Sequence, residues 1–248
     1  MSLPHQLCWS TVETIVDRFA MTEISGDTTP ERLVLTSPMV PDGPVGNLRV
    51  WTGGGLNLVY VGMTVDMIKL DSHMMFAFTA LDSAVPHFTL DSVGNDDDFA
   101  FHLDLIPRLD LGANLAYMDH CYVPLTPIRE AGQAIAGLTP ANIGPRQWAL
   151  MSEWMIVNRA SQPAFEEISG TVGAYRDHWL DLVEAGIPAE LVDGTDADQL
   201  ATRDRRNRDA IFNPDVDLVW ARVTQLVGEE QSERIRLTLA TQGNLIGA

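Results

Sequence analysis

The stretch "VPHFTLDSVGNDDDFAFHLDLIP", from Val85 to Pro107, predicts a β-hairpin that constrains how the rest of the chain can fold. Its two arms alternate between apolar and polar residues with a period of two, which is typical of strands with one buried face. Between the arms, residues 94–98 are of the types that form turns. The apolar positions of the two arms are Phe88, Leu90, Phe99, Phe101, Leu103 and Leu105.

The pairing register of this hairpin decides which polar side chains share its second face. Residues directly opposite each other in an antiparallel pair point to the same side, and a slip of one residue inverts a whole strand. Pairing the two apolar faces therefore gathers a polar row on the other side. This row consists of His87, Thr89, Asp91, Ala100, His102 and Asp104. It is either a solvated outer face or the wall of a cleft beneath another layer.

The remaining segments favour a covered sheet. Residues 33–107 contain β-rich runs broken by turn signals, which predict about six strands, whereas residues 109–242 have mostly helical patterns. Strands followed by helices indicate an α+β fold, and an additional helix over 7–20 allows both faces to be covered. The sequence thus predicts a three-layer α/β/α sandwich with a central, mainly antiparallel sheet. The later helices are expected at residues 113–121, 147–155, 164–185, 196–210, 216–227 and 229–240.

Composition narrows the class of protein. The chain has 248 residues, 46% of them hydrophobic, so we expect a single globular domain over 1–248. A formal net charge of −18 repels phosphate backbones and anionic lipid headgroups, which argues against nucleic acid and membrane partners. Cys8 and Cys121 form no CxxC or Cys/His cluster spaced for zinc, and a reducing cytoplasm suits them. The first 20 residues resemble neither an export signal nor a transit peptide.

Several catalytic motifs are missing from the sequence. It contains no GxSxG, HExxH or EF-hand loop, which argues against the corresponding hydrolases and metalloenzymes, and we expect no metal site. No GxGxxG follows a strand, so we expect no bound nicotinamide or flavin in a dinucleotide fold. Electrons for any redox chemistry would then come from a source other than a cofactor bound in such a fold.

Two charged clusters in the C-terminal half each allow two interpretations. The segment "ATRDRRNRDA" contains Arg203, Arg205, Arg206 and Arg208, and is either a solvated helix face or a docking surface for an acidic protein. Asp215 and Asp217 come at the start of an amphipathic stretch. These carboxylates either favour the positive end of a helix dipole or point into the cleft.

Two groups of segments resemble one superfamily. "HMMFAFTALDSAVPHFTLD", with His73 placed 18 residues before Asp91, is similar to the strand pair of the ferredoxin-dependent bilin reductases. "FHLDLIPRLDLGANLAYMDHCYVPL" and "RDRRNRDAIFNPDVDLVWARVTQLVGEEQSERI" look closer to one branch, red chlorophyll catabolite reductase. The resemblance covers roughly residues 45–240. Thr89 stands where the bilin reductases usually have glycine, and Asp91 where the chlorophyll branch has glutamate.

The resemblance implies an activity and roles for individual residues. It implies reduction of an open-chain tetrapyrrole in a pocket between the sheet and the C-terminal helices, without bound flavin, haem or metal. Electrons would arrive singly from reduced ferredoxin or a similar small carrier. Asp91, His73 and Asp215 would be catalytic, with Asp91 as the proton donor. His87, Thr89, His102 and Asp217 are the expected substrate-binding residues, and His102 would share the proton of Asp91.

Two other functions remain open from the sequence. The same fold and acid could act on another conjugated small molecule, such as a secondary metabolite. Alternatively, the protein could bind a tetrapyrrole without catalysis. Whether it forms a homodimer through an exposed sheet edge is also left open.

Overall fold

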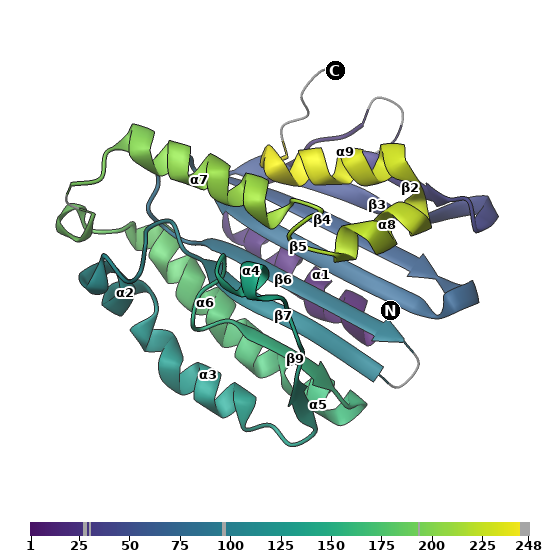
Figure 1. The fold of residues 1–248 in the computed structure, drawn as a ribbon, viewed down its shortest axis with the longest axis horizontal. Helices are drawn as coiled ribbons and strands as arrows, with labels where there is room; N and C mark the ends of the chain where they lie inside the picture. Colours follow the sequence, from purple (N-terminus) through teal and green to yellow (C-terminus); the bar gives the residue numbers. More distant parts are fainter. Residues whose placement is uncertain (27–28, 30, 96–97, 193, 244–248) are drawn as a thin grey trace.

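The centre of the molecule is one antiparallel sheet, seen in the computed structural model, which describes residues 1–26, 29, 31–95, 98–192 and 194–243 (Figure 1). Within these residues its nine strands follow the order β1-β3-β4-β5-β6-β7-β9-β8, and β2 pairs with β3. The strands are β1 (Thr22–Glu23), β2 (Leu33–Ser37), β3 (Val40–Gly53), β4 (Leu56–Val65), β5 (Leu70–Thr79), β6 (His87–Asn95), β7 (Asp98–Ile106), β8 (Leu138–Pro140) and β9 (Ile156–Ala160).

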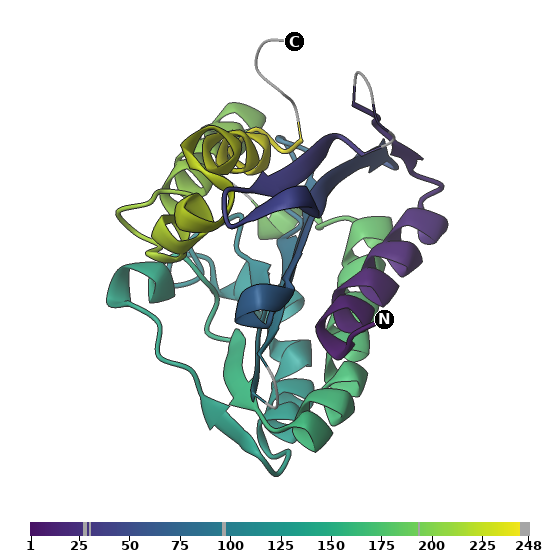
Figure 2. The same cartoon turned by 90° about the vertical axis from the view of Figure 1, so that its right-hand side faces the viewer.

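Helices cover both faces of this sheet, and Figure 2 shows the three layers with the sheet seen on edge. The helices α1, α2, α3, α5 and α6 lie on one face, and α7, α8 and α9 lie on the other. Their bounds are α1 (Leu3–Arg18), α2 (Leu115–Cys121), α3 (Thr126–Gln133), α4 (Pro145–Trp148), α5 (Gln162–Glu167), α6 (Ser169–Ala185), α7 (Ala197–Ile211), α8 (Val219–Val227) and α9 (Glu229–Ala240). The described residues also include the short 3-10 turns η1 (Asp66–Ile68), η2 (Val123–Leu125) and η3 (Ala189–Leu191).

Each face of the sheet has its own apolar core. On the α1/α6 face, the fully buried Trp179 packs against Phe88 with 5.7 Å between ring centroids. On the α7–α9 face, Phe212 packs edge-on against Phe76 at 5.1 Å. Burial of large aromatic side chains on both sides is the main force that holds the helical layers to the sheet.

The hairpin of β6 and β7 has the predicted register. Asp91 pairs with His102, Thr89 with Asp104, and Leu90 with Leu103, so the polar row and the apolar face separate as expected. Of the predicted turn over 94–98, residues 96 and 97 lie outside the described residues. The polar row faces the C-terminal helices and is covered, so its interpretation as a solvated outer face is wrong.

The predicted α+β sandwich is confirmed, but several of its elements differ, and helix α3 (Thr126–Gln133) was not predicted. The sheet has nine strands rather than about six, because β1, β8 and β9 were not predicted. The expected helix over 147–155 is wrong, since only Pro145–Trp148 is helical there. The expected helix over 164–185 is divided into α5 and α6.

Candidate functional site

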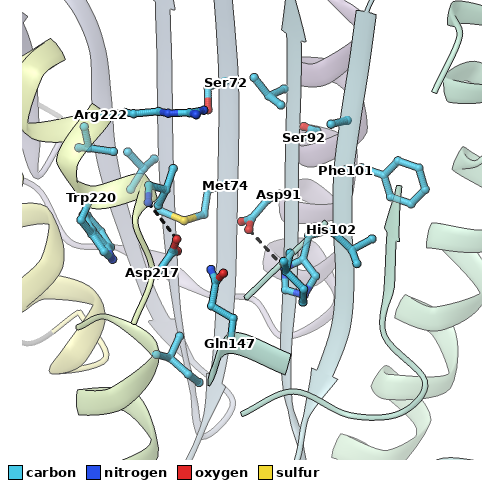
Figure 3. A pocket seen from close by; sticks show the side chains of 18 of the residues that line it. Ser72, Met74, Asp91, Ser92, Phe101, His102, Gln147, Asp217, Trp220 and Arg222 are labelled. Atoms are coloured by element: carbon cyan, nitrogen blue, oxygen red, sulfur yellow. Dashed lines mark hydrogen bonds and ion pairs between the residues drawn. The ribbon is translucent and has the colours of Figure 1, made fainter. Parts of the chain in front are cut away.

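A cavity of about 500 Å³ lies between the sheet and the C-terminal helices. Its floor is formed by β4 to β7 and β9, and its roof by α7, α8 and residues 141–155, which we call the cover segment. Most of the surrounding side chains are apolar, and several polar groups converge among them (Figure 3). The polar side chains that line the cavity include Ser72, Asp91, His102, Gln147, Asp217 and Arg222.

An acid and an imidazole are paired on the floor of the cavity. Asp91 and His102 are directly opposite each other on β6 and β7, and His102 Nδ1 lies 3.3 Å from Asp91 Oδ2. The Asp91 side chain is 39% exposed, whereas that of His102 is 16% exposed. The acid therefore has access to the cavity, and the imidazole lies behind it.

The surroundings of His102 favour its protonated form. Burial alone would lower the pKa of its imidazole. The hydrogen bond and the charge of Asp91, together with the charges of Asp104 and Asp217, more than offset burial and raise the pKa of His102 above its ordinary value. These charges favour a proton on His102, directly beside a carboxylate that can receive it.

Three buried polar atoms of the cavity walls have no hydrogen-bond partner within the part of the chain that the structure describes. They are Asp91 Oδ1, His102 Nε2 and the indole Nε1 of Trp220. Buried polar atoms are nearly always paired in folded proteins, so three such atoms in the walls of one cavity are consistent with a ligand site. Their donors and acceptors suit a ligand with both N–H groups and carbonyl or carboxylate oxygens.

Asp217, and not Asp215, contributes the second carboxylate. Asp217 lines the cavity, where its Oδ1 accepts a hydrogen bond of 3.0 Å from the amide of Val219. Burial raises the pKa of Asp217, and the charge of Asp91 adds to this shift, while the Val219 amide and His102 oppose it. Asp215 is exposed outside the cavity. Its expected catalytic position is therefore wrong, because the turn before α8 directs it to the surface.

His73 points to the opposite face of the sheet. Met74, and not His73, pairs with Asp91, so the His73 side chain lies under α1. There its Nδ1 is 2.7 Å from the hydroxyl of Tyr60 and its Nε2 is 2.8 Å from Asp71 Oδ1. Burial lowers the pKa of His73, against the effect of Asp71. His73 borders the cavity from β5, but its ring points away from Asp91, so the structure does not bring these two expected catalytic side chains together.

The other two expected binding residues lie deeper along the polar row. Thr89 is fully buried and does not line the cavity. His87 accepts a hydrogen bond at Nδ1 from the Thr79 amide at 3.0 Å, and its Nε2 donates to Asp204 Oδ1 at 2.6 Å. Burial lowers the pKa of His87 to about 4, despite the Asp204 hydrogen bond. Both side chains serve the interior of the fold, so their expected contact with substrate is not seen.

The four arginines of α7 divide into two interior and two exposed side chains. Arg208 is buried and pairs with Asp204 at 2.7 Å, and Arg203 donates to the carbonyl of Pro107 at 2.7 Å. Arg205 and Arg206 are exposed. The predicted docking cluster is therefore wrong for Arg208, whose guanidinium stabilises the interior.

Gln147 and Trp220 line the cavity but were not predicted from the sequence. Gln147 follows a proline-rich segment with no strong pattern, and Trp220 reads as an ordinary core residue of an amphipathic helix. No three His, Cys, Asp or Glu side chains among the described residues converge as metal ligands would. Within the described ranges, no helix has both the length and the apolar character needed to cross a membrane.

Comparison with known proteins gives a likeness in structure but none in sequence. No model of a protein family matches the chain, and no curated protein matches it. A similar solved structure is that of phytochromobilin synthase from tomato in complex with biliverdin, with a TM-score of 0.74 and 16% sequence identity. The superposition covers 98% of this chain and 84% of the tomato protein. The chain thus shares its fold with a protein that binds biliverdin.

Proposed function

We propose that this protein reduces an open-chain tetrapyrrole with electrons that arrive singly from reduced ferredoxin or a similar small carrier. In this proposal the substrate lies in the cavity between the sheet and the C-terminal helices, and Asp91 protonates it. No flavin, haem or metal takes part. Which tetrapyrrole is used, a bilin or a red chlorophyll catabolite, is decided by the experiment below.

The main support for the proposal is the pair of polar groups in the cavity. The Asp91–His102 pair lines a largely apolar cavity, and Asp91 Oδ1 and His102 Nε2 are buried there without a hydrogen-bond partner among the described residues. Its volume of about 500 Å³ lies within the roughly 300–1,000 Å³ of small-molecule sites. The fold, shared with a protein solved with biliverdin, supports a tetrapyrrole as the ligand.

The acid–imidazole pair suits alternating transfer of electrons and protons. Reduction of one double bond consumes two electrons and two protons. Each electron adds negative charge to the conjugated system, and protonation by a nearby acid makes the transfer favourable. In the proposed cycle a proton passes from His102 Nδ1 to Asp91 Oδ2, 3.3 Å away, and from Asp91 to the reduced substrate, which leaves Asp91 ionised again. His102 would be recharged from solvent before the second electron arrives.

Asp217 is the proposed second acid. It faces the same cavity as Asp91 but comes from the segment that precedes α8 (Figure 3). Its raised pKa favours a protonated carboxyl closer to neutral pH than for an ordinary aspartate. Two acids on different walls of one cavity could protonate two different positions of an elongated substrate.

The electron carrier is proposed to dock on the exposed side of α7. Arg205 and Arg206 extend from this helix, and Arg206 borders a groove that also contains Leu150. Leu150 lines the cavity as well, so the groove and the cavity share a wall. A carrier bound there would lie close to the substrate.

The proposal is tested by an anaerobic assay with reduced ferredoxin and, separately, biliverdin and red chlorophyll catabolite. We expect one substrate to give a new absorbance band, and Asp91→Asn to bind that substrate with its turnover reduced roughly a hundredfold or more. Asp119→Asn, in the exposed part of α2, is the matched control and should keep full turnover.

Other outcomes of this assay would indicate a different function. Binding of a tetrapyrrole without turnover, unaffected by Asp91→Asn, would identify a non-catalytic binding protein. Absence of binding to both compounds would reject the tetrapyrrole and favour another conjugated small molecule as substrate.

A further inference from the structure

Asp104 is a buried carboxylate next to the Asp91–His102 pair, and the proposed function gives it no role. It is on β7, two residues after His102, and therefore points to the same face of the sheet. Its cross-strand partner is Thr89, and both side chains are fully buried. Asp104 does not line the cavity, so a substrate bound there would not touch it.

The carboxylate of Asp104 is held by the cover segment. Both of its oxygens accept hydrogen bonds from Ser152, Oδ2 from the backbone amide at 2.9 Å and Oδ1 from the hydroxyl. Ser152 is itself 2% exposed, and its Oγ accepts a bond from the Trp154 amide at 3.1 Å. The cover segment is therefore fastened to the sheet at a carboxylate beside His102.

The charge of Asp104 depends on its neighbours. Burial raises its pKa to about 6, and this shift is opposed by the charge of His102, by the two Ser152 donors and, least, by the backbone amide of Leu105. Tyr122 and Tyr175 also lie near it, but burial raises the pKa of both phenols, so they stay neutral. The carboxylates that act on His102 come from three elements: Asp91 on β6, Asp104 on β7 and Asp217 before α8.

We propose that Asp104 is a positioning residue that keeps His102 protonated, and that Ser152 of the cover segment keeps Asp104 charged. The role of His102 as proton supplier rests on the proposed function, whereas the coupling among the three side chains does not. The protonation of His102 thus depends on the hydrogen bonds that the cover segment makes to Asp104 through Ser152. A neutral Asp104 would leave His102 with less support for its charge.

The first experiment measures the pKa of His102 by NMR titration of the imidazole signals in the free protein, with His102→Gln to assign the signal. We expect Asp104→Asn to lower the pKa of His102 by about one pH unit. Ser152→Ala should shift it in the same direction but less, because it removes one of the two donors that stabilise the Asp104 charge. Thr89→Val, in the same buried layer, should leave it unchanged.

The second experiment follows turnover against pH. Since turnover needs protonated His102, its decline at alkaline pH should move to lower pH in Asp104→Asn by the same amount as the NMR value. An unchanged pKa of His102 in Asp104→Asn, or equal shifts in all three variants, would overturn the proposal. If Asp104→Asn does not fold, the Ser152→Ala and Thr89→Val pair decides in the same way. Failure of the wild-type protein to turn over either substrate would reject the proposed function but leave the NMR test intact.

Discussion

His73 and His102 lie in the same sheet but point to opposite faces, and this difference separates a buried structural group from a group near the cavity. Both ring nitrogens of His73 are engaged, one with Tyr60 and one with Asp71. His102 uses Nδ1 for Asp91, and its Nε2 has no partner in the described part of the chain. Only His102 has a nitrogen left for a ligand or a proton path.

This contrast predicts opposite behaviour for two matched substitutions. We expect His102→Gln to reduce turnover roughly a hundredfold, because Asp91 loses its source of protons. His73→Gln should keep turnover within about threefold but lower the free energy of unfolding by about 1–3 kcal/mol, since buried polar partners are left unpaired. Steady-state kinetics and urea unfolding of both variants measure the two effects. Loss of turnover in His73→Gln, with binding and stability intact, would contradict the assignment.

Sequence reasoning predicted that Asp91 and His102 share one face, which the register confirms, but it did not predict that His73 points to the other face, and chain connectivity explains why. A short turn joins β6 to β7, so matching the apolar faces is enough to set the register. β5 and β6 are separated by residues 80–86, a connection that does not fix which residue of β5 meets Asp91. Most residues of β5 and β6 are buried on both faces of the sheet. The pattern of apolar residues therefore could not show whether Met74 or His73 lies opposite Asp91.

At the scale of elements, α7 is fastened to the sheet by a buried charged network. Asp204 accepts a hydrogen bond from His87 on β6 and pairs with Arg208 one turn later on the same helix. Gln242, after α9, also donates to Asp204 at 3.2 Å. The hydrogen bonds of His87 and Arg208 hold the pKa of Asp204 well below its ordinary value, against the effect of burial. This carboxylate thus links α7, which forms part of the cavity roof, to β6 and to the segment after α9.

We expect Asp204→Asn to lower the free energy of unfolding by roughly 3–5 kcal/mol, because Arg208 is left buried with an uncompensated charge. Asp209→Asn changes an exposed residue of the same helix and should alter stability by less than about 0.5 kcal/mol. Urea unfolding at neutral pH compares the two. Equal stabilities would show that the network does not hold α7 in place.

The elements that close the site were the hardest to predict from the sequence. β8 and β9 have three and five residues, and β9 joins the sheet beside β7, about fifty residues earlier in the chain. Such short strands are selected by long-range pairing, and local propensity carries little of that information. In the cover segment, α4 begins at Pro145 and ends at Trp148, so the helix that spacing alone predicted to reach residue 155 stops one turn after it starts.

Charge is distributed unevenly over the whole molecule. Residues 200–248 contain seven Arg and seven Asp or Glu, so the entire formal net charge of −18 resides in residues 1–199. The face formed by α7–α9 is therefore close to neutral, and it carries the exposed Arg205 and Arg206. An acidic electron carrier would be repelled by most of the surface and least by this face.

Repulsion by the net negative charge and attraction by Arg205 and Arg206 act in opposite directions on an acidic carrier. We therefore expect turnover with such a carrier to pass through a maximum as the salt concentration increases. At about 0.01 M salt the screening length is about 30 Å, so the net charge of −18 slows encounter. At about 0.1 M the length is about 10 Å, which screens the distant acids but leaves close contacts with Arg205 and Arg206 effective. Near 1 M, where the screening length is about 3 Å, the local attraction is lost as well.

In the double variant Arg205→Glu, Arg206→Glu we expect substrate binding to persist, turnover at 0.1 M to fall about tenfold, and the rate to increase steadily with salt. A maximum that survives in this variant would place the carrier elsewhere on the surface.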